Sequence, residues 1–132
     1  MNLNWKTIIT GFIVTLTLYV VGASIGHISI LKGTIYVLAP IIGGFTVTYI
    51  NSSNYVDNII NAGFASGIAG FISLFIISGL IEPVFGDYLE LVPVVTITNA
   101  IMAFVIGAIL GLIGGTIGIL IKGQGFEKEN TT

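Results

Sequence analysis

Hydrophobic residues fill four long stretches of the chain, and the charged residues stand between or beyond them. The four stretches, residues 7–31, 33–56, 58–81 and 91–121, contain no Asp, Glu, Lys or Arg. A bilayer core of about 30 Å is crossed by a helix of about 20 residues, so each stretch is long enough to span a membrane. Because backbone polar groups in lipid need partners within the protein, each span is expected to be an α-helix. The pattern predicts an all-α integral membrane bundle of four transmembrane helices.

The expected helices cover residues 5–25, 33–50, 58–80 and 93–121, and a polar tail follows over residues 122–132. Pro40 lies near the middle of the second helix and predicts a kink there, because proline removes a backbone donor. Trp5 and Lys6 are expected to anchor the first helix at the membrane interface. The connections are too short for a soluble domain, so residues 1–132 are predicted to form one membrane domain.

Two alternatives remain open for the organisation of the chain. The first span has features of a signal peptide that would be cut after Ala23. The second alternative is a duplicated pair of helices, which would give parallel repeats. The repeated pieces are Gly11-Phe12 with Gly63-Phe64, and Ile42-Gly43-Gly44 with Ile113-Gly114-Gly115.

Composition and charge agree with a membrane location. Hydrophobic residues make up 55% of the chain and charged residues 8%, whereas a soluble domain carries roughly 25% charged residues. The outer surface is therefore expected to face lipid. Lys6, Lys122 and Lys128 would share one side of the membrane, and only Lys32 would lie on the other. Because lysines in short loops tend to stay inside, both termini are predicted to be cytoplasmic, in the cell membrane.

Glycines on the third and fourth predicted helices recur at helical spacing. Helices in lipid gain stability from close van der Waals approach, which glycine permits. We therefore expect the two glycine faces to pack against each other, or alternatively to form a seam between copies or a gap for a solute. The helix-packing candidates are Gly63, Gly67, Gly70, Gly107, Gly111, Gly114, Gly115 and Gly118.

Polar residues inside the spans are few. Asn61 and Asn99 lie about one turn inside opposite membrane faces, where each is expected to form hydrogen bonds across the bundle or to line a solute path. Thr10, Thr17 and Ser24 recur every seven residues. That spacing places the three hydroxyls near one face of the first helix.

The chain carries little visible reaction chemistry. It has no cysteine, and its one histidine, His27, lies at the outer edge of the first helix. Glu82, Asp87 and Glu90 form the charge cluster of the longest connection, but three carboxylates without a fixed turn make a poor cation site. We therefore predict no catalytic residues, no cofactor and no metal, and expect that the protein is not an enzyme. The few basic residues also argue against a nucleic-acid partner.

Several motifs resemble those of a known group of proteins. They are an Asn-Trp-Lys start, Ala39-Pro40-Ile41-Ile42-Gly43-Gly44-Phe45, the small-residue steps from Asn61 to Gly70, and the glycine ladder of the last helix. With these motifs, the chain resembles the small four-span membrane proteins of unknown function found in methanogenic and other archaea. The resemblance implies the same architecture and brings no activity with it.

The sequence thus favours a non-enzymatic membrane component that acts as a structural or accessory subunit through helix contacts. The alternative is a small oligomeric channel or solute transporter. The expected partners are the lipid bilayer and either further copies of the chain or another membrane protein.

Overall fold

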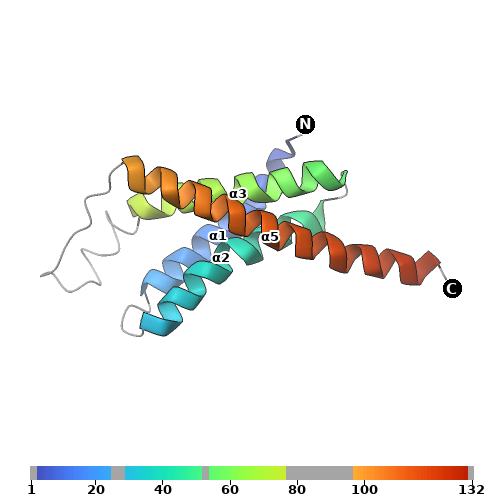
Figure 1. The fold of residues 1–132 in the computed structure, drawn as a ribbon, viewed down its shortest axis with the longest axis horizontal. Helices are drawn as coiled ribbons and strands as arrows, with labels where there is room; N and C mark the ends of the chain where they lie inside the picture. Colours follow the sequence, from blue (N-terminus) through green and yellow to red (C-terminus); the bar gives the residue numbers. More distant parts are fainter. Residues whose placement is uncertain (1–2, 25–28, 52–53, 77–96, 131–132) are drawn as a thin grey trace, which may run out of the picture.

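The computed structural model describes residues 3–24, 29–51, 54–76 and 97–130 and places four α-helices in them (Figure 1). These helices are α1 (Trp5–Ser24), α2 (Ser29–Ile50), α3 (Tyr55–Ile76) and α5 (Ile97–Asn130), and the described residues contain no strand. Each helix includes a segment long and apolar enough to cross a membrane. The segments are Trp5–Ser24, Gly33–Ile50, Tyr55–Ile76 and Ile97–Gly123. The predicted class, all-α with four helices of membrane-spanning length, is confirmed.

Three helix boundaries differ from those expected, and one of them is the start of the third helix at Tyr55 rather than near residue 58. The second helix begins at Ser29 rather than near Gly33, and the last one continues to Asn130 rather than ending near Ile121. The differences in the second and last helices have one cause, because each expected boundary lay beside a lysine that ends an apolar run, Lys32 or Lys122. A charged residue does not end backbone hydrogen bonding, and lysine and glutamate favour helix. Residues 77–80 and 93–96, expected in the third and fourth helices, lie outside the described part of the chain.

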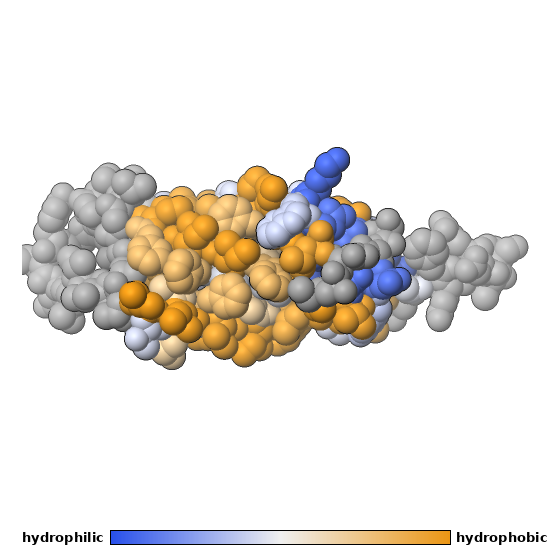
Figure 2. Space-filling model, turned by 90° about the horizontal axis from the view of Figure 1, so that it is seen from above, coloured by the Kyte–Doolittle hydropathy of each residue, from blue (hydrophilic) through white to orange (hydrophobic). Residues whose placement is uncertain are grey.

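The interior of the bundle contains mostly small side chains, both apolar and polar, and its outside is apolar. Among the described residues, the core cluster is formed by Ile8, Val47, Ala62 and Ala65, with Leu3 packed against it. The largest fully buried side chains are Val47, Asn61, Thr15, Thr48, Pro40 and Ser66. Large hydrophobic side chains lie on the outside, and Figure 2 shows them over the middle of the visible face. So large an exposed apolar surface is suited to lipid rather than to water.

The four helices form two antiparallel pairs. Gly22 of α1 lies against Ile35 and Tyr36 of α2, and Gly70 of α3 lies against Ala103 of α5. The pairs cross at mid-length, and α1 and α2 then diverge from α3 and α5 (Figure 1). We call the end that carries Asn51, the start of α1 and the start of α3 the terminal end, and the opposite end the distal end.

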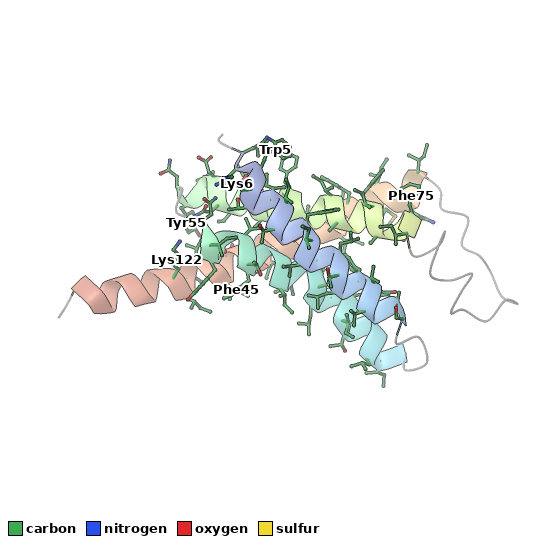
Figure 3. All side chains as sticks on the ribbon, turned by 180° about the vertical axis from the view of Figure 1, so that it is seen from behind. Trp5, Lys6, Phe45, Tyr55, Phe75 and Lys122 are labelled. Carbon is green, nitrogen blue, oxygen red and sulfur yellow. The ribbon has the colours of Figure 1, made fainter. Side chains whose placement is uncertain are left out.

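Aromatic and basic residues mark the terminal end of the bundle. Trp5 and Tyr55 are 59% and 54% exposed. Both lie at this end with Lys6 and Lys122, whereas Phe75 lies at the distal end (Figure 3). Exposed tryptophan and tyrosine near lysine are typical of the membrane–water interface. The part of α5 beyond Lys122 projects past this level and past the other helices (Figure 1).

Candidate functional site

Three asparagines join separate segments at the terminal end, and we call them the asparagine cluster: Asn4, Asn51 and Asn61. The backbone N–H of Asn4 donates to Oδ1 of Asn61 at 3.3 Å, and Nδ2 of Asn4 donates to Oδ1 of Asn51 at 3.3 Å. Asn51 is 4% exposed and Asn61 0%. The cluster therefore ties the residue before α1 to the end of α2 and to the second turn of α3.

Lys122 extends this network to the last helix. Its Nζ donates to the backbone carbonyl oxygen of Asn51 at 2.6 Å. Asn51 follows the last residue of α2, where carbonyl groups lack helical partners and the helix dipole favours a cation. Lys122 therefore stabilises the end of α2 and holds α5 beside it.

Buried hydroxyl groups continue inward from the asparagine cluster. The Oγ1 of Thr15 donates to the carbonyl of Gly11 at 2.8 Å, and that of Thr48 donates to the carbonyl of Phe45 at 3.1 Å. The Oγ of Ser66 crosses between helices and donates to the carbonyl of Pro40 at 2.9 Å. These hydroxyls serve the backbone, and all three residues are 0% exposed.

The two asparagines expected near a solute path lie far apart in the bundle. Asn61 is on the second turn of α3 at the terminal end, whereas Asn99 is on the first turn of α5 at the distal end. Asn61 is fully buried and Asn99 is exposed. The structure does not bring them together into one site.

The outward hydroxyls of α1 follow the expected pattern. Thr10, Thr17 and Ser24 are all exposed. Thr10 donates to the carbonyl of Lys6 at 2.9 Å, and Ser24 donates to that of Val20 at 2.8 Å. A hydroxyl that bonds one turn back in its own helix can face lipid without leaving its proton unpaired.

Five of the eight candidate glycines lie between α3 and α5. A Cβ added at Gly107 would lie 2.6 Å from the carbonyl oxygen of Ser66, and one added at Gly70 would lie 2.6 Å from that of Ala103. A side chain at either position would collide with the facing backbone. The five glycines of this contact are Gly63, Gly67, Gly70, Gly107 and Gly111.

The other three candidate glycines, all on α5, approach α2. The sequence predicts a contact of these glycines with the third helix and does not indicate one with the second. Gly114 lies against the backbone of Ile41, Gly118 against Thr48 and Phe45, and Gly115 against both Thr48 and Ala62. A Cβ at Gly44 would in turn meet the backbone of Gly111. The two Ile-Gly-Gly motifs thus meet where α2 crosses α5. Their repetition in the sequence was the available signal for this contact.

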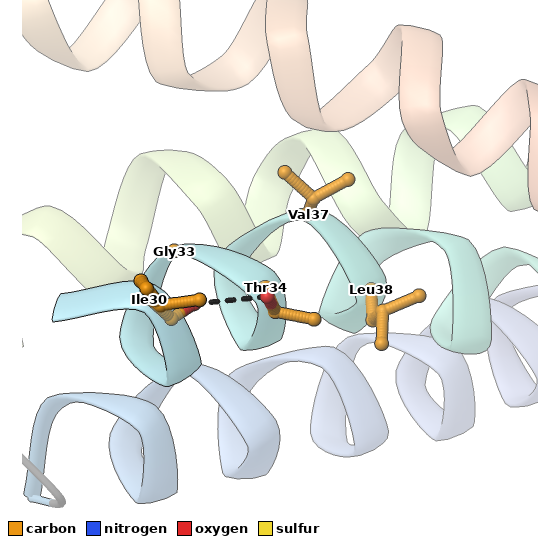
Figure 4. A pocket seen from close by; sticks show the side chains of 5 residues that line it. All are labelled: Ile30, Gly33, Thr34, Val37 and Leu38. Carbon is orange, nitrogen blue, oxygen red and sulfur yellow. Dashed lines mark hydrogen bonds between the residues drawn. The ribbon is translucent and has the colours of Figure 1, made fainter. Parts of the chain in front are cut away.

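A shallow hollow lies on the distal half of α2 (Figure 4). It is lined by Ile30, Gly33, Thr34, Val37 and Leu38. The Thr34 hydroxyl donates to the carbonyl of Ile30 at 2.9 Å. The hollow is otherwise apolar and presents no charged group of the described residues to a ligand.

The remaining candidates from the sequence fall elsewhere. His27, Glu82, Asp87 and Glu90 lie outside the described residues. Within the described part of the chain, no group of three His, Cys, Asp or Glu residues is placed to hold a metal ion.

Most of the chain matches the model of a protein family. The model of a family of unknown function, DUF5518, matches residues 5–121, which include the first three spans and all but the last two residues of the fourth. The chain belongs to the DUF5518 family. Its resemblance to membrane proteins of unknown function is confirmed to that extent, and the occurrence in archaea stays a prediction. No curated protein and no solved structure matches the chain at a significant level.

Membership in DUF5518, a family of unknown function, assigns no activity to the chain. The matched residues include Asn51, Asn61 and the glycines of both helix contacts, but they stop just before Lys122 and leave out Asn4. The residues that close the terminal end of the bundle therefore lie partly outside the family match.

Proposed function

We propose that this protein is a non-enzymatic, multi-pass component of the cell membrane that acts as a structural or accessory subunit through helix contacts. The main support is that its buried polar side chains form hydrogen bonds within the bundle. Thr15, Thr48 and Ser66 all donate to backbone carbonyls, and Asn51 and Asn61 join segments of the bundle. The bonds of Ser66, Asn51 and Asn61 join separate segments, whereas Thr15 and Thr48 satisfy carbonyls of their own helices.

The partner of such a subunit would meet the outer faces of the bundle. The candidate glycines are occupied by contacts within the chain, so a partner cannot use them without separating α5 from its neighbours. Large side chains are available instead, such as Phe71 on α3 (36% exposed) and Ile109 on α5 (52% exposed). Membrane helices associate through van der Waals packing of such surfaces.

A pull-down of the full chain in mild detergent, followed by mass spectrometry, tests the proposal. A stable companion from the same membrane is expected. Phe71→Ala or Ile109→Ala should weaken its retention and leave the melting temperature of the isolated chain unchanged. Gly111→Leu is the internal control, because it should disturb the bundle itself. Recovery of a monomer without companions would contradict the accessory role.

The second candidate is a channel or solute transporter formed by several copies, and the exposed Asn99 favours it. Because Thr15, Asn61 and Ser66 are fully buried, its path would lie between copies rather than through one bundle. A homo-oligomer that raises liposome permeability, with a flux altered by Asn99→Leu, would support this candidate. An oligomer that leaves permeability unchanged would oppose it.

The proposed orientation places both termini in the cytoplasm. Lys6 and Lys122 share the terminal end (Figure 3), and basic residues near span ends favour the inner face.

A further inference from the structure

One stripe of α2 has different surroundings in its two halves. Its positions are separated alternately by four and three residues, a spacing that keeps them on one side of a helix. They are Ile30, Thr34, Val37, Ile41, Gly44 and Thr48. In the terminal half of α2, Gly44 and Thr48 lie against the glycines of α5. In the distal half α5 diverges from α2 (Figure 1), and Ile30 and Val37 are 84% and 50% exposed. The stripe that packs against α5 therefore continues into a part that the described residues leave exposed.

The hollow on this exposed part has the form of a packing site for one side chain of another helix (Figure 4). Four of its lining residues stand at positions i, i+3, i+4 and i+7 of α2: Ile30, Gly33, Thr34 and Val37. When two helices pack side by side, four residues in this arrangement form the hole that receives a side chain of the facing helix. The hollow therefore matches the surface that a second helix requires.

Gly33 lies in the floor of this hollow and serves no packing contact within the described chain. A Cβ at Gly33 would meet nothing within 4 Å, whereas a Cβ at each other described glycine before Gly123 would lie within that distance of a neighbouring atom. A glycine inside a helix costs about 0.5–1 kcal/mol relative to alanine. In a membrane this cost is offset where the missing side chain lets another helix approach closely. Gly33 therefore indicates a contact with a helix outside this chain's own bundle.

The distal half of α2 is held in place from another side by α1. Gly22 of α1 lies against Ile35 and Tyr36, and the ring centroids of Tyr19 and Tyr36 are 5.7 Å apart. The exposed stripe is thus presented by a packed pair of helices, and a partner meets it without separating α1 from α2.

The exposed stripe is complementary to itself. In a parallel pair of α2 helices, residues at equal height face each other, so Thr34 of each copy enters the hollow of the other. A two-fold axis along the membrane normal produces this pairing between copies inserted in the same orientation. The Thr34 hydroxyl already donates to the carbonyl of Ile30 at 2.9 Å, so it enters an apolar contact with its proton satisfied.

We propose that the distal half of α2 is the contact surface of a parallel homodimer, in which Thr34 of each copy packs over Gly33 of the other. The terminal halves of the two α2 helices stay with their own α5 and diverge from each other. This inference does not rest on the proposed accessory function, and it uses none of the glycines that hold the bundle together.

Disulfide cross-linking tests the dimer, because the chain contains no cysteine. Val37→Cys places one thiol on the stripe, and Leu31→Cys places a control thiol on the same helix outside the stripe; Val37 is 50% and Leu31 41% exposed. The full chain is oxidised in proteoliposomes at a low ratio of protein to lipid, and the linked dimer is followed on a non-reducing gel. Val37→Cys should link about tenfold faster than Leu31→Cys, because paired thiols are held together whereas the others meet by collision.

A second substitution fills the hollow without disturbing the bundle. Gly33→Leu, added to Val37→Cys, should lower the linking rate to that of Leu31→Cys, and it should leave unfolding of the single chain unchanged because its Cβ meets open space. Gly123→Leu is the matched control at the other glycine with nothing within 4 Å, and it should leave the linking rate unchanged. Equal rates at positions 37 and 31 would overturn the proposal and show that lipid alone covers the stripe. So would rapid linking that survives Gly33→Leu, or an equal loss with Gly123→Leu.

Discussion

At the scale of single residues, glycine has opposite surroundings at different points of the same membrane protein. A Cβ at Gly111 would lie 2.6 Å from Cβ of Ser66 and 2.7 Å from the carbonyl oxygen of Ala62, whereas one at Gly33 would meet nothing within 4 Å. The first glycine is required by the packing and the second is not. Spacing along the helix does not distinguish them, because only the neighbouring helix defines the free space.

The first prediction compares these two glycines. Gly111→Ala should lower the free energy of unfolding by about 1–3 kcal/mol, since it overpacks a contact made partly of backbone. Gly33→Ala should leave it unchanged or raise it by up to about 1 kcal/mol, because alanine favours helix. Unfolding in mixed micelles with increasing sodium dodecyl sulfate measures both. Equal destabilisation by the two substitutions would contradict the close packing of Gly111 against α3.

The second prediction concerns the hydroxyl of Ser66. Ser66→Ala removes its hydrogen bond to Pro40 on a different helix and should cost about 1 kcal/mol of stability, as is typical of bonds between membrane helices. Ser24→Ala is the matched control, because the Ser24 hydroxyl is exposed and bonds within α1. The same unfolding assay applies. If the Ser66→Ala protein is as stable as the Ser24→Ala protein, the hydrogen bond from Ser66 to Pro40 does not contribute to stability.

At the scale of elements, α5 has two parts with different surroundings. Its membrane-spanning segment ends at Gly123, and the helix continues to Asn130. Lys122 lies at the boundary and bonds back to Asn51, so one side chain fixes where α5 leaves the bundle. A lysine can reach a carbonyl in this way because its long apolar stem tolerates the membrane interface.

The third prediction tests this connection between helices. Lys122→Gln should destabilise the bundle by about 1 kcal/mol, because it removes the cation from the end of α2. It should also speed hydrogen exchange in the last turn of α2. The middle of α1, which Lys122 does not contact in any described bond, supplies the internal reference. Unchanged exchange at the end of α2 would contradict the capping role.

At the scale of the whole molecule, the four helices are arranged with small residues inside and large apolar residues outside. Ile30, at the distal end, is 84% exposed, whereas Ala39 and Val47 on the same helix are 0% exposed. Lipid can cover the outer residues without cost, so the bundle must be held by close backbone contacts and by hydrogen bonds. These contacts are concentrated in the asparagine cluster and where the glycines of α5 pack against α2 and α3.

The fourth prediction concerns orientation. Single thiols introduced by Lys6→Cys and Gly123→Cys should react with a membrane-impermeant maleimide in inverted vesicles but not in intact cells. Ile30→Cys should show the reverse. Positions 6 and 123 lie at the terminal end, where basic residues favour the cytoplasm, and position 30 lies at the distal end. Labelling of positions 6 and 123 from opposite sides would contradict the bundle topology itself.

Parts of the candidate site could be read from the sequence. Asn61 stands out in the sequence because an amide inside an apolar run is costly unless it is hydrogen-bonded. Nothing in the sequence links Asn4 and Asn51 to Asn61, although the predicted topology places the start of the first helix, the end of the second and the start of the third on the same side. Their pairing depends on how closely α1, α2 and α3 approach, and that distance is not encoded in hydropathy.

The sequence by itself determined the all-α class and the four helices of membrane-spanning length that the described residues contain. It could do so because the length and polarity of an apolar run set the cost of placing it in lipid. The tertiary structure alone decided that the glycines of α5 are shared between α3 and α2. It also decided that Asn4, Asn51 and Lys122 meet at one end. Such contacts arise from the crossing of helices distant in sequence, where close packing selects one arrangement among the several that the same pattern permits.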